Sequence, residues 1–381
     1  MKKPRVIIAG VTSGVGKTSI TCSIIYGIKQ KGYSVQPFKV GPDYIDPTYL
    51  SAISGNSTRN LDSWIMGEKA TLESFSKNSQ SDISIIEGVM GYYDGFSGIS
   101  NQSSTHHIAT ILNSPVILVL DASKTARSIA ATALGFMKFH KNSRIVGLIL
   151  NKIGSKKHEQ MCRAALRTIK IPIIGCIPKN PELSLESRHL GLIPTIEQTN
   201  LKQKIIDISK KISPYLDIEK IISIACSTSP INKIPEPKYE KPKITIAVAL
   251  DKSFNFYYYD NFDSLQKNGA KIEFFSPISD VSPPECSGVY FGGGFPEVLG
   301  KPLSQNQSMK KSIKKLAEQN MPIYAECGGL MYLTKTIEYD SKKYSMVGLF
   351  DAITSMEKKI DRKSTRLNFS HIPLSRMPSS A

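Results

Sequence analysis

The chain has 381 residues, of which 40% are hydrophobic and 21% are charged. This length exceeds one ordinary core and predicts two domains, and the composition is typical of a globular protein rather than a disordered one. No apolar run approaches the roughly 18 residues of a membrane span. The short apolar run behind the basic N-terminus is typical of a first strand, not of a signal peptide. We therefore expect a cytoplasmic protein without a membrane partner.

Net charge and cysteine spacing narrow the range of ligands and partners that we expect. The net charge of +17 is best explained by lysines spread over solvated faces, and next by a polyanionic small substrate together with ATP. Nucleic acid ranks third, because the basic residues form no single stripe, and we expect no nucleic-acid partner. The six cysteines form no C-x-x-C pair, which argues against a zinc site or a disulfide framework.

Apolar, β-rich runs alternate with amphipathic stretches along the first part of the chain. The amphipathic stretches include residues 19–31 and 127–138. The expected strands are residues 5–9, 34–39, 83–87, 116–121, 145–151 and 173–177. This alternation predicts an α/β fold with a doubly wound parallel sheet.

The pattern changes twice in the second part of the chain. A Lys- and Ile-rich segment followed by prolines predicts a terminal helix and a linker. A second series of expected strands follows, at residues 244–249, 271–275, 288–291 and 322–325. We therefore predict a first α/β domain at 1–197, the helix and linker at 198–242, an incomplete second α/β domain at 243–360, and an anomalous tail at 361–381.

A glycine-rich loop joins the first expected strand to the first expected helix. In this context backbone N–H groups and a helix N-terminus bind phosphate, Lys17 reaches the terminal phosphates and Thr18 holds Mg²⁺. The strict G-x-x-x-x-G-K-[ST] pattern is not met, because Val11 stands at its first glycine. Ser13 stands where partition-type ATPases have a lysine. The predicted ATP site comprises Thr12, Ser13, Gly14, Val15, Gly16, Lys17, Thr18 and Ser19.

Four acidic residues follow the next two expected strands. Asp43 and Asp46 lie in a Gly/Pro-rich loop at the carboxyl end of the sheet, where open α/β folds bind ligands. Glu87 closes a buried apolar run, where a charge needs a partner, and stands where such ATPases have a metal-binding acid. Asp94 follows in the next loop. A loop-capping role for Asp43 and Asp46 is the alternative.

A cysteine between an expected strand and an expected helix is the second candidate site. The small residues around Cys327 permit a sharp turn that exposes a nucleophile at a helix N-terminus. The backbone N–H groups of Gly293, Gly294 and Gly328 are candidates for an oxyanion hole. The segment therefore predicts thiol chemistry.

Histidines are few near either site. A thiol nucleophile needs a base, and the only histidine after Cys327 is His371, inside the anomalous tail, to which we assign no role. His106 and His107 are adjacent and point in different directions. A structural or substrate-contacting role is therefore favoured for them over metal ligation.

Taken together, these segments resemble the cobyrinate a,c-diamide synthases, the glutamine-dependent amidases of the cobalamin pathway. The resemblance runs from about Pro4 to Met356, and the combination is more specific than any single motif. It is carried by residues 10–18, 39–47, 60–62, 87–95, 149–154, 188–192, 254–258, 292–297 and 325–333.

The resemblance implies a synthetase domain related to dethiobiotin synthetase, fused to a flavodoxin-like, triad-type glutaminase domain. The implied metal ligands for Mg²⁺ are Thr18, Asp43 and Glu87, and Asn151 is an adenine contact. The implied substrate contacts are Lys39, Asp43, Tyr44 and Asp46. The implied catalytic residues are Asp46, Asp94 and the nucleophile Cys327.

The implied reaction phosphorylates acetate carboxylates of an anionic corrinoid with ATP, and ammonia from L-glutamine then displaces phosphate. A homodimer is compatible with the family. The family continues past residues 348–350 with a His-containing motif, which the tail replaces here. Three alternatives stay open: another tetrapyrrole (hydrogenobyrinate or nickel sirohydrochlorin), a partition-type ATPase switch, and a non-catalytic remnant.

Overall fold

The computed structural model describes residues 2–183, 187–188, 191–192, 201–231 and 239–356. Contacts between Cα atoms divide the chain into two compact units, Met1–Glu240 with Tyr257–Gly269, and Lys241–Phe256 with Ala270–Ala381. Within the described ranges, no helix is long and apolar enough to cross a membrane. The predicted tail at 361–381 and His371 lie outside the described residues, and the predicted domain boundaries stay predictions.

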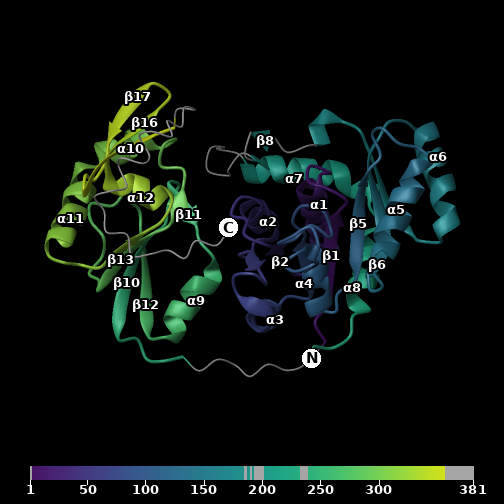
Figure 1. The fold of residues 1–381 in the computed structure, drawn as a ribbon, viewed down its shortest axis with the longest axis horizontal. Coiled ribbons are helices and arrows are strands. Elements are labelled where there is room, and N and C mark those ends of the chain that lie inside the picture. Colours follow the sequence, from purple (N-terminus) through teal and green to yellow (C-terminus); the bar gives the residue numbers. More distant parts are fainter. Residues whose placement is uncertain (1, 184–186, 189–190, 193–200, 232–238, 357–381) are drawn as a thin grey trace. The chain divides into compact units, whose positions relative to one another are not determined.

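The first unit is built on a seven-stranded sheet in the order β3-β2-β4-β1-β5-β6-β7, in which every pairing is parallel (Figure 1). Six of these strands fall where alternating apolar runs predict them, which confirms the doubly wound sheet. The strands are β1 (Arg5–Gly10), β2 (Val35–Val40), β3 (Arg59–Leu61), β4 (Ile83–Glu87), β5 (Val116–Asp121), β6 (Ile145–Ile153) and β7 (Ile173–Pro178). A separate antiparallel pair joins β8 (Ser187–Arg188) to β9 (Gly191–Leu192).

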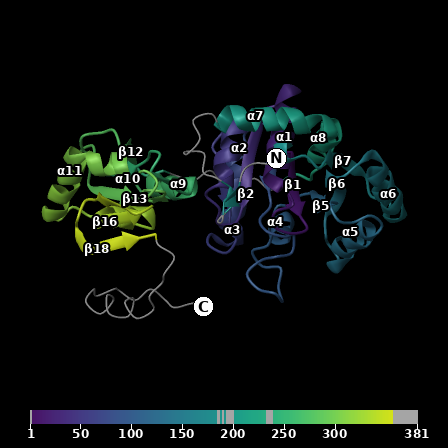
Figure 2. The same cartoon turned by 90° about the horizontal axis from the view of Figure 1, so that it is seen from above.

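Helices cover both faces of this sheet, because successive residues of a buried strand point to opposite sides. Val6 and Ile8 pack in one core with residues of α1, α2, α7 (Leu201–Ile212) and α8 (Ile218–Cys226), whereas Ile7 and Ala9 pack in the other with residues of α3 to α6. Figure 2 shows α1, α7 and α8 on one face and α4 and α5 on the other. The helices are α1 (Lys17–Gln30), α2 (Asp46–Ser54), α3 (Gly67–Asn78), α4 (Thr105–Ile111), α5 (Ser128–Phe139) and α6 (Lys156–Leu166).

The segment for which we predict one terminal helix contains two. Helix α7 (Leu201–Ile212) is followed by a 3₁₀ turn at Ser213–Tyr215 and by α8 (Ile218–Cys226). Pro214 stands in that turn, where its ring and its missing N–H end the first helix. Helix α8 then packs on α1 at Gly27, where a Cβ atom would come within 2.6 Å of Ile218 Cδ1.

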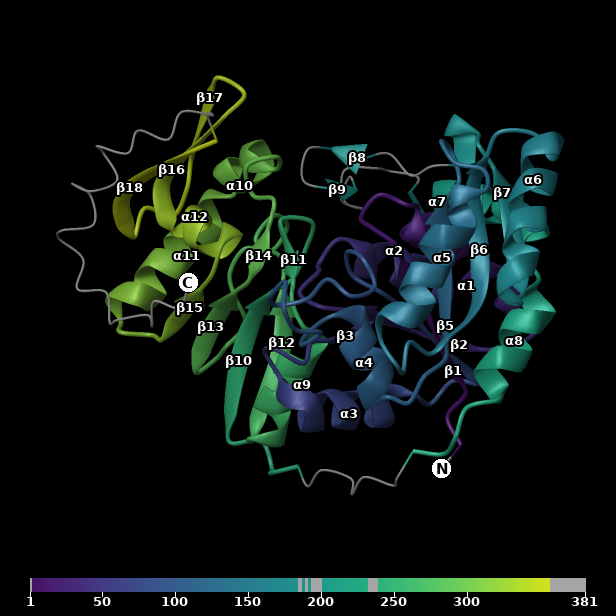
Figure 3. The ribbon, with the colours of Figure 1, turned by 45° about the vertical axis from the view of Figure 1, so that its right-hand side comes forward.

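The second unit contains a four-stranded parallel sheet in the order β12-β10-β13-β15 (Figure 3). Two smaller ladders accompany it, β11 with β14 and β16 with β17 and β18. The strands are β10 (Ile244–Ala249), β11 (Phe254–Phe256), β12 (Ala270–Phe275), β13 (Gly288–Phe291), β14 (Gly293–Gly294), β15 (Ile323–Ala325), β16 (Thr334–Tyr339), β17 (Lys342–Ser345) and β18 (Phe350–Ser355). Its helices are α10 (Gly300–Gln305), α11 (Gln307–Glu318) and α12 (Gly328–Leu333), whereas α9 (Tyr259–Lys267) groups with the first unit.

Candidate active site

The predicted residues of the first unit meet at the carboxyl edge of its sheet. Strand β4 lies between β2 and β1, so that Glu87 pairs with Lys39 on one side and with Ile8 on the other. The predicted phosphate loop follows β1, Asp43 and Asp46 follow β2, Glu87 ends β4, and Asp94 lies in the loop after β4. Topology thus assembles side chains that are far apart in sequence.

The phosphate loop is shaped by two glycines with left-handed backbone. Gly14 has φ 75° and Gly16 has φ 93°, a region that L side chains rarely adopt. A Cβ atom on Gly16 would lie 2.5 Å from Asn151 Nδ2, which donates to the carbonyl oxygen of Val15 at 2.8 Å. Asn151 therefore braces the phosphate loop, while its predicted adenine contact stays a prediction.

Lys17 lies at the first position of α1 and is buried beneath the loop. Its Nζ donates to the carbonyl oxygens of Met90 at 2.6 Å and Thr12 at 3.2 Å. Burial and the charge of Lys39 lower the pKa of Lys17 to about 8. A bound anion would favour the protonated form of Lys17 and raise its pKa. This property suits a phosphate-binding role.

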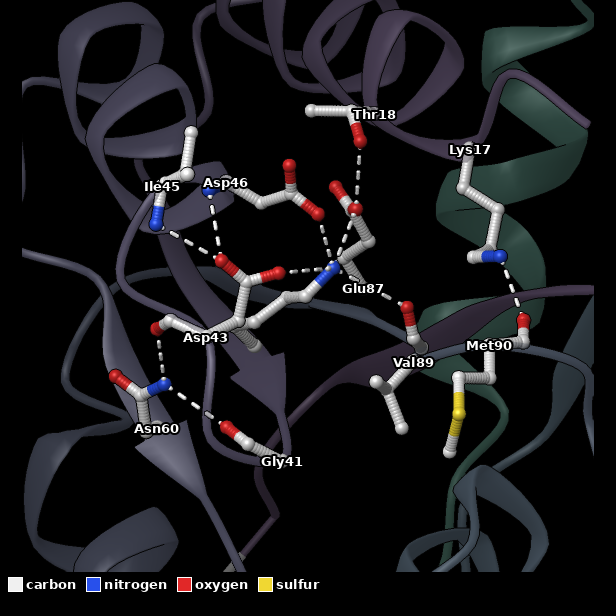
Figure 4. Close-up of polar contacts among 12 residues, drawn as sticks. Lys17, Thr18, Gly41, Asp43, Ile45, Asp46, Asn60, Glu87, Val89 and Met90 are labelled. Carbon is white, nitrogen blue, oxygen red and sulfur yellow. Dashed lines mark hydrogen bonds and ion pairs between the residues drawn. The ribbon is translucent and has the colours of Figure 1, made fainter. Parts of the chain in front are cut away.

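Lys39 is almost fully enclosed, with its side chain only 2% exposed. Its Nζ lies 2.5 Å from Asp46 Oδ2, 2.8 Å from Glu87 Oε1 and 3.5 Å from Asp43 Oδ2. Figure 4 shows these three carboxylates pointing toward one another. Burial alone would lower the pKa of Lys39, but the three carboxylates outweigh burial and raise it above its usual range.

Three carboxylates facing one ammonium cannot all be neutralised by it. Burial raises the pKa of Glu87 to about 7, against the opposing effect of Lys39. Burial would also raise the pKa of Asp46, but its closer contact with Lys39 holds that pKa below its usual value. Near neutral pH Glu87 is therefore partly protonated, while Asp46 stays ionised.

Glu87 and Thr18 fit a magnesium ion. Thr18 Oγ1 donates to Glu87 Oε1 at 2.9 Å, while Glu87 Oε2 is buried and has no hydrogen-bond partner among the described residues. Mg²⁺ in phosphate-binding sites uses one or two protein oxygen ligands and completes its shell with phosphates and water. No group of three His, Cys, Asp or Glu side chains in the described ranges could hold a metal by itself.

Asp43 has the capping role that we left as the alternative, whereas its predicted metal-binding and substrate-binding roles stay predictions. Its Oδ1 accepts from the backbone N–H groups of Ile45 at 2.8 Å and Asp46 at 3.1 Å, at the start of α2. Asn60 Nδ2 donates to the carbonyl oxygens of Gly41 and Asp43, at 3.0 and 2.8 Å (Figure 4). The loop that presents Asp43 is therefore fixed from two sides.

The remaining predicted residues of the first unit line the same edge. Asp94 Oδ2 accepts from the backbone N–H of Gly91 at 2.9 Å, and its charge acts on Lys17. Tyr44 stacks on Tyr258 of the same unit, with ring centroids 4.6 Å apart. The structure thus gathers these side chains, whereas their individual roles stay predictions.

Both adjacent histidines have structural contacts. His106 is buried, and its Nε2 lies 3.1 Å from the carbonyl oxygen of Asn142. His107 Nε2 lies 3.0 Å from Glu68 Oε1, and its Nδ1 accepts from the backbone N–H of Ser103. These contacts agree with the structural role that the sequence favours over metal ligation.

In the second unit Cys327 lies on a strained turn between β15 and α12. Its backbone has φ 49° and ψ −116°, and its side chain is exposed. A Cβ atom on Gly293 would lie 3.5 Å from Cys327 Cβ, and one on Gly328 would lie 3.1 Å from the nitrogen of Gly294. Gly293 and Gly294 therefore pack closely against the turn that carries Cys327 and Gly328, while the predicted oxyanion hole stays a prediction. The sequence contains no histidine between His189 and His371.

Sequence reasoning missed three contributors to the first site. Asn60 holds the Asp43 loop, the carbonyl oxygen of Met90 accepts from Lys17, and Lys152 Nζ donates to Asp121 Oδ2 at 2.6 Å and to the carbonyl oxygen of Gly14 at 3.3 Å. The role of Asn60 could have been predicted, because its strand β3 lies beside β2, which leads into the Asp43 loop. The carbonyl oxygen of Met90 is a backbone atom and leaves no signal in side-chain patterns, and Lys152 meets Asp121 because β5 and β6 are neighbours in the sheet.

Comparison with known proteins gives consistent results. Residues 6–193 match the model of the CobQ/CobB/MinD/ParA nucleotide binding domain, and residues 245–373 match that of the CobB/CobQ-like glutamine amidotransferase domain. The chain is 43% identical over 371 residues to the cobyrinate a,c-diamide synthase of Dehalococcoides mccartyi, covering 95% of this chain and 80% of that protein. It is 44% identical over 360 residues to that of Caldanaerobacter subterraneus, covering 93% and 79%.

Among solved structures, the MinD cell division protein of Aquifex aeolicus is 18% identical and covers 55% of this chain and 96% of its own. Its TM-score of 0.33 is too low to carry an argument. The identity and coverage of the synthases are high enough to show the family, and both family models agree with the observed α/β units. The chain therefore belongs to the cobyrinate a,c-diamide synthase family, with a nucleotide binding domain followed by a glutamine amidotransferase domain.

Proposed function

We propose that this protein amidates the a and c acetate side chains of cobyrinate, using ATP and L-glutamine. The observation that carries the proposal is the buried Lys39 among three carboxylates, at the same sheet edge as a phosphate loop. Such an arrangement can hold a substrate carboxylate against a terminal phosphate. The names of the related synthases support the choice of substrate.

In the first step ATP activates the carboxylate. The backbone N–H groups of the loop and the start of α1 bind the phosphates, and Lys17 neutralises their charge. Lys39 offsets part of the negative charge of Asp43, Asp46 and Glu87, which lets the substrate carboxylate approach the terminal phosphate. A carboxylate oxygen attacks the γ-phosphorus, the bond to ADP breaks and an acyl phosphate forms. Mg²⁺, held by Thr18 and Glu87, would supply further positive charge to the phosphates.

In the second step ammonia completes the amide. Its nitrogen attacks the acyl carbon, phosphate leaves with the electrons of the C–O bond, and a proton passes to solvent. Cys327 supplies this ammonia: its sulfur attacks the side-chain amide carbon of glutamine, ammonia leaves, and water hydrolyses the thioester to glutamate. The thiol needs a proton acceptor, and His371 lies outside the described residues. The test of the function therefore compares glutamine with free ammonium as the source of nitrogen.

Two other functions compete. The same chemistry on hydrogenobyrinate or nickel sirohydrochlorin uses the same phosphate loop and Lys39 cluster. A partition-type ATPase switch would use the phosphate loop alone and would give no role to Cys327 on its strained turn.

The test is ATP-dependent amidation of cobyrinic acid, hydrogenobyrinic acid and nickel sirohydrochlorin, each with glutamine and with ammonium in parallel. The proposal predicts diamide from cobyrinic acid with the highest kcat/KM. Cys327→Ala should lose the reaction with glutamine and keep the reaction with ammonium. Preference for another macrocycle would change the substrate, and DNA-stimulated ATP hydrolysis without any amide would overturn the proposal.

A further inference from the structure

Two aromatic side chains stack on each other while remaining largely in solvent. Trp64 and Phe96 have ring centroids 4.1 Å apart and planes inclined by 17°, yet they are 52% and 55% exposed. Ile65 and Ile99 in the same two loops are 60% and 99% exposed. Single exposed apolar side chains are common, but a stacked aromatic pair in solvent, with two further exposed apolar residues in the same loops, is typical of a binding surface.

This patch belongs to loops that leave the carboxyl edge of the sheet. Trp64 lies in the loop after β3, whose Asn60 pairs with Lys39 of β2 and donates to the carbonyl oxygen of Asp43. Phe96 lies in the loop after β4, two residues beyond Asp94, whose charge acts on Lys17. One loop is therefore tied to the carboxylate-binding cluster and the other to the phosphate loop.

Hydrogen bonds hold the two loops in place. Asp62 Oδ1 accepts from the backbone N–H groups of Trp64 at 2.9 Å and Ile65 at 3.1 Å. The backbone N–H of Phe96 donates to the carbonyl oxygen of Gln102 at 2.9 Å. His107 joins the loops: its Nδ1 lies 2.9 Å from Ser63 Oγ and 3.1 Å from the backbone nitrogen of Ser103. The pair is therefore presented on a braced support.

We propose that Trp64 and Phe96, with Ile99, form a platform that receives the apolar face of the tetrapyrrole macrocycle. This inference rests on the proposed function, because that function defines the substrate. The Lys39 cluster and Lys17 offer charged and polar groups only, and they leave the broad ring system without a partner. A flat aromatic pair on loops from the same edge of the sheet supplies that contact, and the peripheral carboxylates of the ring can then reach Lys17 and the phosphate loop.

The test measures binding of cobyrinic acid by equilibrium dialysis for the full chain, together with KM for cobyrinic acid and for ATP. Trp64→Ala and Phe96→Ala should each raise the Kd and the KM for cobyrinic acid at least tenfold, as expected for loss of a stacking partner. The KM for ATP should stay within twofold. Trp64→Phe should restore most of the affinity.

Tyr33→Ala is the matched control, because Tyr33 is an exposed aromatic (42%) that lies just before β2, at the opposite edge of the sheet. It should leave every constant unchanged, and thermal unfolding verifies that all variants are folded. Unchanged Kd in both alanine variants would overturn the platform, even if the wild type amidates cobyrinic acid. Weakened binding without amidation by the wild type would support the platform and reject the proposed function. Absence of wild-type binding would overturn the platform as well.

Discussion

At the scale of single residues, the chemistry of the site depends on its charge balance, because its carboxylates outnumber the ammonium group that they face. Lys39 is fully enclosed and faces Asp43, Asp46 and Glu87. Burying charges costs free energy, and removing one partner of a buried ion pair typically costs about 3–5 kcal/mol, because the other partner stays buried and unpaired. The cluster is therefore expensive to maintain, which is typical of a site selected for function.

Glu87 makes the stability of the fold depend on pH. Its pKa of about 7 in the folded protein exceeds its ordinary value of 4.5, so between these values the native state holds a proton that the unfolded chain has released. Stability should therefore fall as pH rises from about 4.5 to 7, by at most about 3 kcal/mol for this group. Urea unfolding at pH 5 and 7.5 should show this loss in the wild type and a smaller one in Glu87→Gln.

Glu73→Gln is the control for that comparison, because Glu73 lies on α3 with its side chain 43% exposed. It should follow the wild type at both pH values. An identical pH dependence in Glu87→Gln and in the wild type would show that Glu87 is ionised in the native state throughout.

Lys17 makes ATP binding depend on pH in another range. Because its pKa in the free protein is about 8, ATP binds above that pH only with uptake of a proton. The Kd for ATP should therefore rise by up to about tenfold per pH unit above pH 8. Below about pH 7 Lys17 is already protonated, so its titration should no longer change the Kd. Calorimetry in two buffers of different ionisation enthalpy should detect proton uptake at pH 9 in the wild type, and none attributable to this position in Lys17→Arg. Equal proton uptake in both proteins would contradict the assignment.

At the scale of structural elements, the phosphate loop is defined by backbone shape more than by its side chains. Gly16→Ala would force a Cβ atom toward Asn151 Nδ2 at a residue with φ 93°. ATP binding should fall at least tenfold, since the loop must move to relieve the contact. Gly135→Ala, in α5 with no atom within 4 Å of the added Cβ, should bind ATP normally and gain about 0.5–1 kcal/mol of stability. Calorimetric titration with ATP and thermal unfolding distinguish the two effects, and normal binding by Gly16→Ala would refute this account of the loop.

The elements differ in how well the sequence predicts them. Strands β4, β5, β10 and β13 have the predicted bounds, because each apolar run ends close to glycine or polar residues of the following loop. Strands β16 to β18 were not predicted, since polar and charged residues interrupt their apolar positions. The phosphate loop and the cysteine turn are local motifs and were recognised.

The site cluster needed the fold as well. Lys39 and Glu87 are 48 residues apart, and only the order β2-β4-β1 makes them neighbours. The Trp64 and Phe96 pair had no signal in the sequence, because stacking between two loops depends on how the loops are braced. Periodicity predicts burial, but it does not predict which loops meet.

At the scale of the whole molecule, two units carry two separable chemistries. The first holds the phosphate loop and the Lys39 cluster, and the second holds Cys327 on its strained turn. The net charge of +17 suits an anionic substrate and ATP, although it specifies neither. The step that links the two units is the activation of a substrate carboxylate by ATP, which the proposed function requires.

The most direct measurement follows oxygen. Cobyrinic acid labelled with ¹⁸O in its carboxylates is amidated with ATP and ammonium, and the released phosphate is examined by mass spectrometry. An acyl phosphate transfers one carboxylate oxygen to phosphate, so the account predicts one ¹⁸O atom in phosphate for each amide formed. Phosphate without ¹⁸O, or ATP hydrolysis without amide, would contradict it.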